Sequence, residues 1–461
     1  MTDLIESAAR GVAAPELIIL ISGGIFFLFY SGFVQYRYFG HAINILRGKY
    51  DDPNAPGQIS AYEALSTALA STVGMGNIGG VATAISIGGP GALFWMWVTA
   101  FVGMSTNFFT SALSVMYRGK DSAGNIQGGP MYVIREKLNR NWLPLAYLFC
   151  VCCMVGCLPI FQANQLTQII VDVGIDDAEI KAMSFLIGGY EVNTPKLIIG
   201  LLLTIISGIV IIGGIQRIGS WAGKMVPLMI VIYFFSVLAI IVLNIEAVPG
   251  YLWMVITDAF SAQHYHGNPA LGGIVGGLIV TGVQRASFSN EAGIGTAPLA
   301  LGASKSTEPI REGLVSMLSP AIDTLLVCTL TALAILVTGI WKTSDLSGVS
   351  LTTAAFEESL GTGGKYLLLI SAFFFAITSL FSYSYYGNKS ISFIVGVKSG
   401  KWYDYFYLST IVIGSVVSMQ VVTNIIDIAY ALMAVPTMLS GFILAPKVMQ
   451  AAKEYFQRMG L

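Results

Sequence analysis

The sequence predicts an all-α polytopic membrane protein, and three observations lead to this fold class. Of the 461 residues, 55% are hydrophobic and only 11% are charged, whereas charged residues make up about 25% of an average soluble domain. Apolar stretches of about 20 residues, the length that crosses a bilayer as a helix, recur along the chain. Lys and Arg side chains gather in alternate connecting segments. The lipid bilayer is therefore an expected partner, and no basic tract indicates a nucleic acid.

The apolar stretches give eleven expected transmembrane helices. They cover residues 16–36, 60–86, 91–117, 143–172, 196–213, 222–245, 271–300, 312–340, 365–386, 404–422 and 425–445. The first stretch continues as an amphipathic segment to residue 46, and a tight turn at Gly88–Gly91 separates the second stretch from the third. A polar loop over residues 246–270 precedes the seventh. We expect these helices to form one transmembrane domain over residues 1–461.

The basic residues give an independent test of this list of helices and also orient the chain. If the N-terminus is outside, the inner segments carry 18 Lys and Arg residues and the outer segments carry 5, while Arg285 lies within a span. Short cytoplasmic loops of membrane proteins are enriched in Lys and Arg. We therefore expect a cell-membrane protein with its N-terminus outside and its C-terminus in the cytoplasm.

The second expected helix contains a stretch, residues 71–80, that a lipid-exposed helix should avoid. Its ten residues include four glycines, two hydroxyl side chains and one amide. Backbone groups released by a broken helix cost several kcal/mol each in hydrocarbon unless protein or water satisfies them. Small residues are also the usual contact between membrane helices. The stretch is thus either an ordinary glycine-packed contact or the wall of a site for a small polar solute.

The seventh expected helix contains a second polar interruption, over Gly282–Ser289, five helices after the first. A repeat with an odd number of helices is inverted in the membrane, so residues 60–245 and 271–450 have the form of a five-plus-five inverted repeat. Each repeat opens with a discontinuous helix, and the N-terminal helix over residues 16–46 is extra. Hydropathy alone supports this repeat. Paired interrupted helices indicate the binding site of a secondary transporter.

Half-helix ends explain why such a site suits an amino acid. The start of a half-helix has free N–H groups that hold a carboxylate, and its end has free carbonyls that coordinate a cation or an ammonium group. We expect the amides of Gly74, Met75, Gly76 and Asn77 near a carboxylate. We expect the carbonyls of Ala70, Thr72 and Val73 near a cation.

A series of motifs runs from about residue 70 to residue 390. They include Thr72-Val73-Gly74-Met75-Gly76-Asn77-Ile78-Gly79-Gly80, Gly88-Gly89-Pro90-Gly91-Ala92, Gly128-Gly129-Pro130-Met131-Tyr132, Gln162-Ala163-Asn164 and Phe288-Ser289-Asn290-Glu291-Ala292-Gly293. Together they resemble the alanine or glycine:cation symporter family. The first motif is also similar to the unwound first core helix of the neurotransmitter:sodium symporters. The resemblance implies their fold and Na⁺-coupled uptake of alanine or glycine by alternating access.

The resemblance also implies roles for individual residues. One Na⁺ site would use the carbonyls of Ala70 and Val73 with the hydroxyls of Thr378 and Ser379, an oxygen-only shell that suits a hard cation. A second cation site would use Thr72, Asn77, Thr281 and Asp323. The expected substrate-binding residues are Thr72, Gly74, Met75, Gly76, Asn77, Phe161, Gln162, Thr281, Gly282, Gln284 and Phe288. Arg285 and Glu291 are expected to act in gating. No organic cofactor is implied, and Na⁺ is the expected coupling ion.

Each of these residues also has a structural interpretation. Asp323 lies within an apolar helix, where a carboxylate costs at least about 2.5 kcal/mol, so a functional role competes with a purely structural partner. Arg285 and Glu291 could pair with each other. The hydroxyls of Thr378 and Ser379 could bond the carbonyl four residues earlier. The family commonly has Arg-Gly where this chain has Arg285-Ala286, which leaves the substrate preference open.

The leading hypothesis is a Na⁺-coupled symporter for small neutral amino acids. The alternative within the same fold is a proton-coupled symporter, with Asp323 or Glu291 as the proton carrier. An intramembrane enzyme is disfavoured because no expected span contains histidine and neither HExxH nor GxSxG occurs. A channel is disfavoured because two interrupted helices suit an occluded site better than a continuous polar pore.

Overall fold

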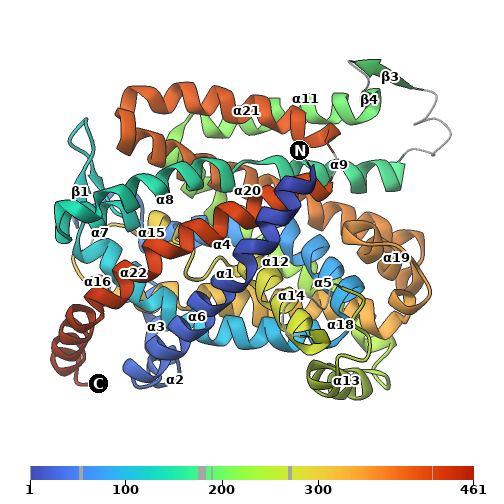
Figure 1. The fold of residues 1–461 in the computed structure, drawn as a ribbon, viewed down its shortest axis with the longest axis horizontal. Helices are drawn as coiled ribbons and strands as arrows, with labels where there is room; N and C mark the ends of the chain where they lie inside the picture. The colour runs from blue at the N-terminus through green and yellow to red at the C-terminus, as the bar shows by residue number, and fades with distance from the viewer. Residues whose placement is uncertain (1, 51–54, 175–182, 188–189, 268–272, 418) are drawn as a thin grey trace.

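The structure is a computed structural model that describes residues 2–50, 55–174, 183–187, 190–267, 273–417 and 419–461. Lys181, which entered the count of basic residues, and residues 271–272, the expected start of the second repeat, lie outside the described residues. Almost all the described elements are helices (Figure 1). Two small antiparallel hairpins are the exceptions: β1 (Gly119–Lys120) pairs with β2 (Ile126–Gln127), and β3 (Ser184–Ile187) pairs with β4 (Tyr190–Asn193). The predicted all-α class is confirmed.

The first half of the chain forms α1 (Thr2–Tyr30), α2 (Val34–Arg37), α3 (Phe39–Leu46), α4 (Ala61–Thr72), the π-helical turn η1 (Gly76–Gly80), α5 (Val81–Gly88), α6 (Gly91–Met116), α7 (Pro130–Lys137), η2 (Arg140–Trp142), α8 (Leu143–Gly156), α9 (Ile160–Gly174), α11 (Thr194–Ile211), α12 (Gly214–Leu243) and α13 (Val248–Ser261). The second half forms α14 (Gly273–Asn290), α15 (Thr296–Leu301), α16 (Pro309–Ser316), α17 (Leu318–Pro320), the π-helical η3 (Ala321–Cys328), α18 (Thr329–Thr338), η4 (Ile340–Lys342), α19 (Gly348–Leu360), α20 (Thr362–Val395), η5 (Val397–Ser399), α21 (Gly400–Val416) and α22 (Met419–Met459).

Eight helices in the described part of the chain are long and apolar enough to cross a membrane, and nine if the bent pair α4 and η1–α5 counts as one span. At the two remaining expected positions lie α14, with 18 residues, and α21, with 17. The sequence of α14 is unusually polar for a span, and α21 is short. The count of eleven transmembrane helices therefore stays a prediction.

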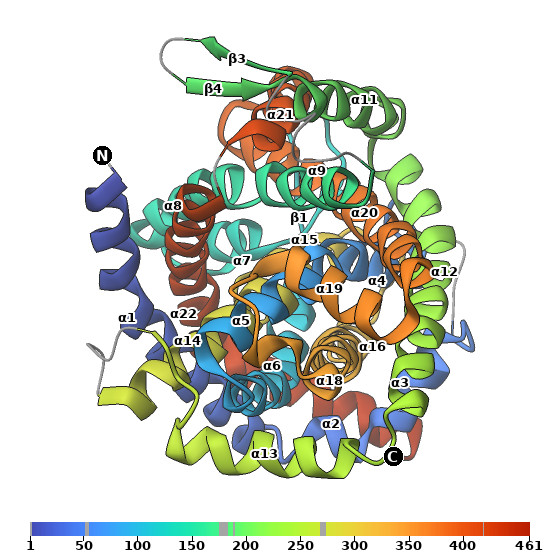
Figure 2. The same ribbon diagram turned by 90° about the vertical axis from the view of Figure 1, so that its right-hand side faces the viewer.

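The outer helices carry the apolar surface that lipid requires. On α11 and α12, Leu202, Ile205 and Phe235 are 55%, 62% and 62% exposed. Contiguous exposed apolar surface of this kind marks an interaction face, which for these long helices is the bilayer. The first broken helix, in contrast, lies in the interior with α15, surrounded by other helices in both views (Figures 1 and 2). Every residue of α4 from Ala64 to Thr72 is buried.

The first broken helix begins with a capping box. The Ser60 hydroxyl accepts from the Glu63 N–H, and the Glu63 carboxylate accepts from the Ser60 N–H, which satisfies two free donors at the start of α4. The helix then ends at Thr72, and the next part of the span is bent from it by 46°. At the break the Gly74 N–H donates to the Thr72 carbonyl over 2.8 Å, a three-residue turn centred on Val73. The predicted first break is confirmed.

The second break lies later in the chain than predicted. The helix α14 stays intact through Gly282–Ser289 and ends at Asn290. The chain then turns through left-handed conformations at Glu291, Gly293 and Gly295, with φ of 53°, 85° and 107°, before α15 begins. Gly tolerates these angles because it lacks a Cβ atom. Arg285, Ser289 and Asn290 of α14 bond side chains that are distant in the sequence, and the helix stays intact around them.

Candidate functional site

Backbone N–H groups at the first break donate to side-chain oxygens. The Gly74 N–H donates to Asn77 Oδ1 over 2.9 Å, and the Met75 N–H donates to Gln162 Oε1 over 2.9 Å. Gln162 lies on α9, so the structure brings the predicted residues of two helices together. Buried backbone donors need such partners, and here flexible side-chain oxygens provide them.

Three helices meet at Gly74. A Cβ atom added there would lie 2.4 Å from the Ser379 hydroxyl oxygen and 3.2 Å from both polar atoms of the Gln162 amide. Ser379 lies on α20, and its hydroxyl donates to the Ala70 carbonyl over 2.8 Å. Only glycine allows α4, α9 and α20 to approach this closely. The predicted cation-site residues Ala70 and Ser379 are therefore in contact.

The hydroxyl of Thr378 is directed to its own helix. It donates to the Phe374 carbonyl over 2.8 Å, which is the bond to the carbonyl four residues earlier that the sequence left open. Ser379 makes the corresponding bond to Phe375 over 3.0 Å in addition to its contact with Ala70. In this conformation Ser379, but not Thr378, bonds to the first broken helix.

A buried carboxylate lies next to the break. Asp323 belongs to η3, and its two oxygens accept from Asn77 Nδ2 over 2.6 Å, from the Ser289 hydroxyl over 2.8 Å and from the Thr324 hydroxyl over 2.7 Å. All four residues are buried. Within the described ranges no basic side chain lies within ion-pair distance of Asp323. A π-helical turn is rare and frequently marks a functional site.

Three residues of this carboxylate cluster, Ser289, Thr324 and Asn290, were not predicted from the sequence. Ser289 follows Phe288 directly within a motif that was recognised, so the motif itself contained the signal. Thr324 is adjacent to Asp323, but its orientation depends on the π-helical turn, which shifts side chains relative to an ordinary helix. Asn290 completes the cluster, since its Nδ2 donates to the Thr324 hydroxyl over 3.0 Å.

Three predicted residues of α14 lie away from the first break. The Thr281 hydroxyl donates to Gly277 of its own helix over 3.0 Å. Gly282 faces α6, where an added Cβ would lie 2.6 Å from Trp95 Cβ, so its role there is close helix packing. Gln284 lines a cavity with Thr281. Among the described residues no hydrogen bond is found between Thr281 and Asp323, whereas Ser289 of the same helix bonds that carboxylate.

Two aromatic rings lie over the break. Phe161 on α9 and Phe288 on α14 meet edge to face with ring centres 4.5 Å apart. Phe288 also lies against Gly76, where an added Cβ would be 3.3 Å from its ring. Aromatic pairs in this geometry contribute about 0.5–1.5 kcal/mol beyond their burial. The pair covers the first break on one side.

A cavity of about 730 Å³ opens on the far side of these rings. It is lined by residues of η1, α9, α11, α14 and α22, including Gly80, Phe161, Gln165, Lys196, Thr281, Gln284, Arg285, Asn424 and Asp427. In its wall Arg285 forms an ion pair with Asp427 over 2.7 Å, and both side chains are 11% exposed. The Arg285 guanidinium also lies 5.6 Å from the centre of the Phe288 ring. This cation–π contact connects the ion pair to the aromatic cover.

Arg285 and Glu291 do not pair with each other. Glu291 lies in the second break and accepts from the Tyr383 hydroxyl over 2.6 Å and from the Tyr430 hydroxyl over 3.1 Å. Its carboxylate therefore connects the second break to α20 and α22. Arg285, before that break, faces the cavity instead. Asp427 and the two tyrosines were not predicted, because their distance along the sequence hides these contacts.

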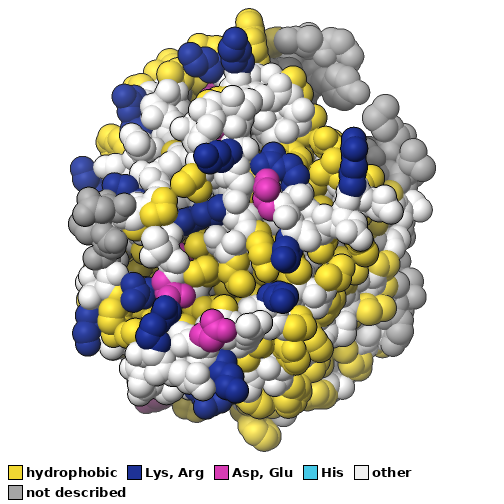
Figure 3. All heavy atoms as spheres, turned by 90° about the vertical axis from the view of Figure 1, so that its left-hand side faces the viewer, with side chains coloured by type: hydrophobic (Ala, Val, Ile, Leu, Met, Phe, Trp, Pro, Cys, Tyr) yellow, Lys and Arg dark blue, Asp and Glu magenta, His cyan; other side chains and the backbone are white. Residues whose placement is uncertain are grey.

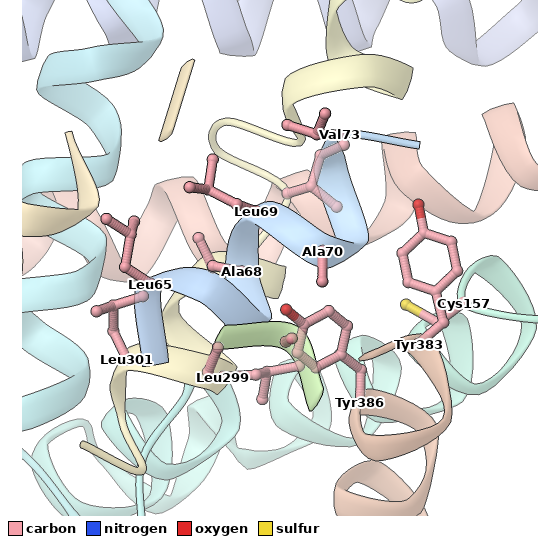
Figure 4. Close-up of a cluster of buried hydrophobic side chains, with 14 of the residues drawn as sticks. Leu65, Ala68, Leu69, Ala70, Val73, Cys157, Leu299, Leu301, Tyr383 and Tyr386 are labelled. Atoms are coloured by element: carbon pink, nitrogen blue, oxygen red, sulfur yellow. The ribbon is translucent and has the colours of Figure 1, made fainter. Parts of the chain in front are cut away.

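Packed apolar side chains close the opposite side of the break. Figure 4 shows Leu65 and Leu69 of α4, Leu299 and Leu301 of α15, and Tyr386 of α20 converging in one buried cluster. The Tyr386 hydroxyl lies 3.1 Å from the Ser71 hydroxyl. The break thus has a cavity on one side and a packed core on the other. This asymmetry is expected for a carrier that is open to one side of the membrane and closed to the other.

Breaking the Arg285–Asp427 ion pair should slow uptake of the transported solute. We expect Asp427→Asn to reduce the initial uptake rate by about tenfold, because it leaves a partly buried guanidinium without its counter-charge. Lys196→Gln is the matched control, since Lys196 lines the same cavity and bonds Gln168 rather than an acid. Equal rates for Asp427→Asn and Lys196→Gln would contradict a specific role for the ion pair. The readout is uptake of labelled solute by cells that express each variant.

Comparison with known proteins agrees with this geometry. The model of the sodium:alanine symporter family matches residues 1–460. The sodium/alanine symporter AgcS of Methanococcus maripaludis is 35% identical over 98% of this chain and 97% of its own length. An uncharacterised transporter of Haemophilus influenzae is 37% identical over 97% of this chain and 94% of its own length. A probable sodium/glutamine symporter of Bacillus subtilis, GlnT, is 32% identical over 95% of this chain and 87% of its own length.

One solved structure shows the fold. The crystal structure of MhsT in complex with L-phenylalanine superposes with a TM-score of 0.56 at 12% identity, covering 86% of this chain and 98% of that one. The expected likeness to the neurotransmitter:sodium symporter fold is confirmed at the level of overall architecture. The family match likewise confirms a transporter rather than an enzyme. The chain belongs to the sodium:alanine symporter family.

Proposed function

We propose that this chain is a Na⁺-coupled symporter that imports small neutral amino acids, with alanine as the leading substrate, by alternating access. Membership of the family makes it a multi-pass amino acid:cation symporter. The identity of the amino acid and of the cation is the proposal. The relatives' names include both alanine and glutamine, so family membership alone leaves the substrate open.

The substrate carboxylate is proposed to bind the amides of the first break. Gly74 and Gly76 have no side chain, and a Cβ atom added at either would lie within 3.4 Å of Ser379, Gln162 or Phe288, so little room is left beside this backbone. The Met75 N–H is held by the Gln162 carbonyl oxygen in this conformation, and rotation of that amide would present its NH₂ group to the carboxylate. Phe161 and Phe288 would then cover a small side chain. A tight fit of this kind favours alanine over larger amino acids.

One Na⁺ is proposed to bind between the first broken helix and α20. Its ligands would be the carbonyls of Ala70 and Val73 with the hydroxyls of Thr378 and Ser379. The 2.8 Å contact between Ser379 and the Ala70 carbonyl supports this set, because both oxygens already face each other. All are hard oxygen ligands of the type that alkali and alkaline-earth cations prefer. Thr378 would rotate away from the Phe374 carbonyl to join them.

A second cation is proposed to bind at Asp323. The structural neighbours of this carboxylate favour Asn77, Ser289 and Thr324 as further ligands, with the Thr72 carbonyl, in place of the Thr281 suggested by resemblance. A buried carboxylate without a basic partner is costly unless a cation or several donors compensate it. Asp323 would thus supply the counter-charge for a bound ion.

The membrane arrangement is also part of the proposal: eleven spans, an inverted five-plus-five repeat, and a cytoplasmic C-terminus in the cell membrane. In Figure 1, β1, α7 and α16 lie at the left-hand end of the molecule. Figure 3 views that end and shows many Lys and Arg side chains and few acidic ones. This supports a cytoplasmic location for it. The 730 Å³ cavity at Lys196 and Asp427 would then open to the outside.

The observation that carries the proposal is the close approach of Ser379 and Gln162, residues of the proposed ion and substrate sites, at Gly74. We would test it with purified protein in liposomes loaded with K⁺ buffer and diluted into Na⁺ buffer at constant pH, with labelled L-alanine outside. We expect accumulation that requires the Na⁺ gradient and stops when the gradient is dissipated. Accumulation driven by a pH gradient without Na⁺ would instead support the proton-coupled alternative. Absence of transport for any small neutral amino acid would reject both.

A further inference from the structure

The loop after the second broken helix is held by one arginine. Arg118 follows α6, and its guanidinium donates to the carbonyls of Gly302, Ser304 and Ser306 over 3.0, 2.6 and 2.7 Å. It also donates to the Pro56 carbonyl over 3.2 Å and to the Ser304 hydroxyl over 3.3 Å. Its partners lie just after α15 and just before α4. One side chain thus joins the inner ends of both broken helices.

Backbone hydrogen bonds join the same two segments directly. The Gln58 N–H donates to the Ala303 carbonyl over 2.8 Å, and the Lys305 N–H donates to the Ile59 carbonyl over 2.6 Å. Ile59 and Ser304 form an isolated parallel bridge. A Cβ atom at Gly57 would lie 2.2 Å from the Ser304 carbonyl oxygen. The two backbones can approach this closely because Gly57 has no side chain. We call residues 56–59 and 302–306, with Arg118, the inner latch.

A second basic side chain holds α15 from the other side. Lys389 on α20 is only 4% exposed, and its ammonium donates to the Leu299 carbonyl over 3.0 Å and to the Tyr385 hydroxyl over 3.1 Å. The last carbonyls of a helix lack partners within it and attract cations. Lys389 also lines a cavity of about 180 Å³ with Gln58 and Asp121, next to the inner latch. Water can therefore approach the latch from the inner side.

The arginine is suited to this place for a chemical reason. Its planar guanidinium has five N–H donors in a fixed arrangement and stays charged at any physiological pH, whereas a lysine ammonium has three donors and no plane. Hydrogen bonds from a charged donor are about twice as strong as neutral ones. The hydrogen-bond acceptors of Arg118 are carbonyl and hydroxyl oxygens without net charge, and the buried Glu312 carboxylate also attracts the guanidinium. Such a contact can hold a closed state firmly and still be reversible.

We propose that Arg118 is a positioning residue that latches the inner side of the carrier shut while the outer cavity is open, and that the inner latch opens in every transport cycle. The inference rests on the proposed alternating access. When the inner ends of α4 and α15 separate, the packing of Leu65 and Leu69 against Leu299 and Leu301 is also lost. Loss of the Arg118 contacts then favours the inward-open state.

The test measures access to a buried position behind the latch. Ala68 is fully buried in the apolar cluster of Figure 4, and the five native cysteines are all buried. In an Ala68→Cys background we would follow labelling by a membrane-impermeant maleimide in inside-out vesicles without Na⁺. We expect Arg118→Gln to raise the labelling rate at least about tenfold, because hydrogen bonds to a charged group are each worth about a factor of ten or more. Arg118→Lys should give an intermediate rate.

Controls separate latch opening from unfolding. Arg140 is exposed on the same basic end of the molecule, so Arg140→Gln should leave the rate unchanged. Labelling of Cys150, buried in α8 outside the inner latch and the proposed ion sites, should stay low in every variant, since unfolding would expose it. Should Arg118→Gln fail to fold, Gly57→Ala perturbs the same contact with Arg118 present and should also speed labelling. An unchanged rate in folded Arg118→Gln or Gly57→Ala protein would overturn the proposal.

This readout does not depend on transport. Faster labelling of the Arg118 variants in a protein that moves no amino acid would support the inner latch and reject the proposed substrate. Na⁺-driven alanine uptake by the wild type, with unchanged labelling in the variants, would support the proposed function and reject the latch.

Discussion

We expect Gly74→Ala to reduce Na⁺-driven alanine uptake about 100-fold while the protein remains folded in the membrane. The added methyl group would lie 2.4 Å from the Ser379 hydroxyl and 3.2 Å from the Gln162 amide. Forcing an extra carbon into a packed site costs about 1–3 kcal/mol, and the upper end of that range corresponds to about 100-fold. Because the methyl group pushes on both the proposed ion ligands and the proposed carboxylate site, binding of both ligands should weaken.

The matched control for Gly74→Ala is Gly363→Ala. Gly363 lies in the first turn of α20, and an added Cβ there meets nothing within 4 Å. The same chemical change should therefore leave uptake near the wild-type rate. Uptake by Gly74→Ala that equals uptake by Gly363→Ala would show that the close approach of the three helices is not needed for transport.

The second large effect concerns the buried carboxylate. We expect Asp323→Asn to weaken Na⁺ binding, and with it Na⁺-stimulated alanine binding, by about 100-fold. An amide supplies no counter-charge for the ion, and removing one partner of a buried charge pair costs about 3–5 kcal/mol. Its NH₂ group would also face either the Asn77 donor or the Ser289 and Thr324 donors, where the carboxylate accepts three hydrogen bonds.

Na⁺ titrations of purified protein, followed by the shift in thermal unfolding, would measure this loss. A ligand stabilises the state it binds by an amount that grows with its affinity, so Na⁺ should raise the unfolding temperature of Asp323→Asn less than that of the wild type. Asp345→Asn, an exposed change in the loop before α19, is the control. If Na⁺ stabilised Asp323→Asn as well as it stabilises the wild type, the carboxylate would have no part in ion binding.

Local composition was enough to predict the first break. The glycines and polar side chains of residues 71–80 have their structural consequence within the same stretch, at the bend between Thr72 and Gly76. The second break was misplaced because a sequence shows polarity but not the partner that satisfies it. Gln284 and Arg285 look like helix breakers in lipid, yet Arg285 pairs with Asp427, 142 residues later, and its helix stays intact.

The residues of the proposed ion sites likewise include some that the sequence could identify and some that it could not. Ala70 and Ser379 could be matched from the resemblance because each occupies a place fixed by the shared fold. The Thr281 hydroxyl bonds Gly277 of its own helix in this conformation, an arrangement that the sequence could not show because it depends on α14 continuing unbroken to Asn290. Nothing in the sequence indicated the contacts that Arg118 makes. Its partners are backbone carbonyls, which look the same in every sequence.

The measurement that tests the central proposal most directly is alanine binding to the purified protein by titration calorimetry over a series of Na⁺ concentrations, with K⁺ as the replacing ion at constant pH. If carboxylate and Na⁺ share the first break, alanine affinity must rise with Na⁺, and Na⁺ affinity must rise by the same factor when alanine is bound. Equal alanine affinity in Na⁺ and in K⁺ would contradict the proposal that solute and ion are held together at Gly74.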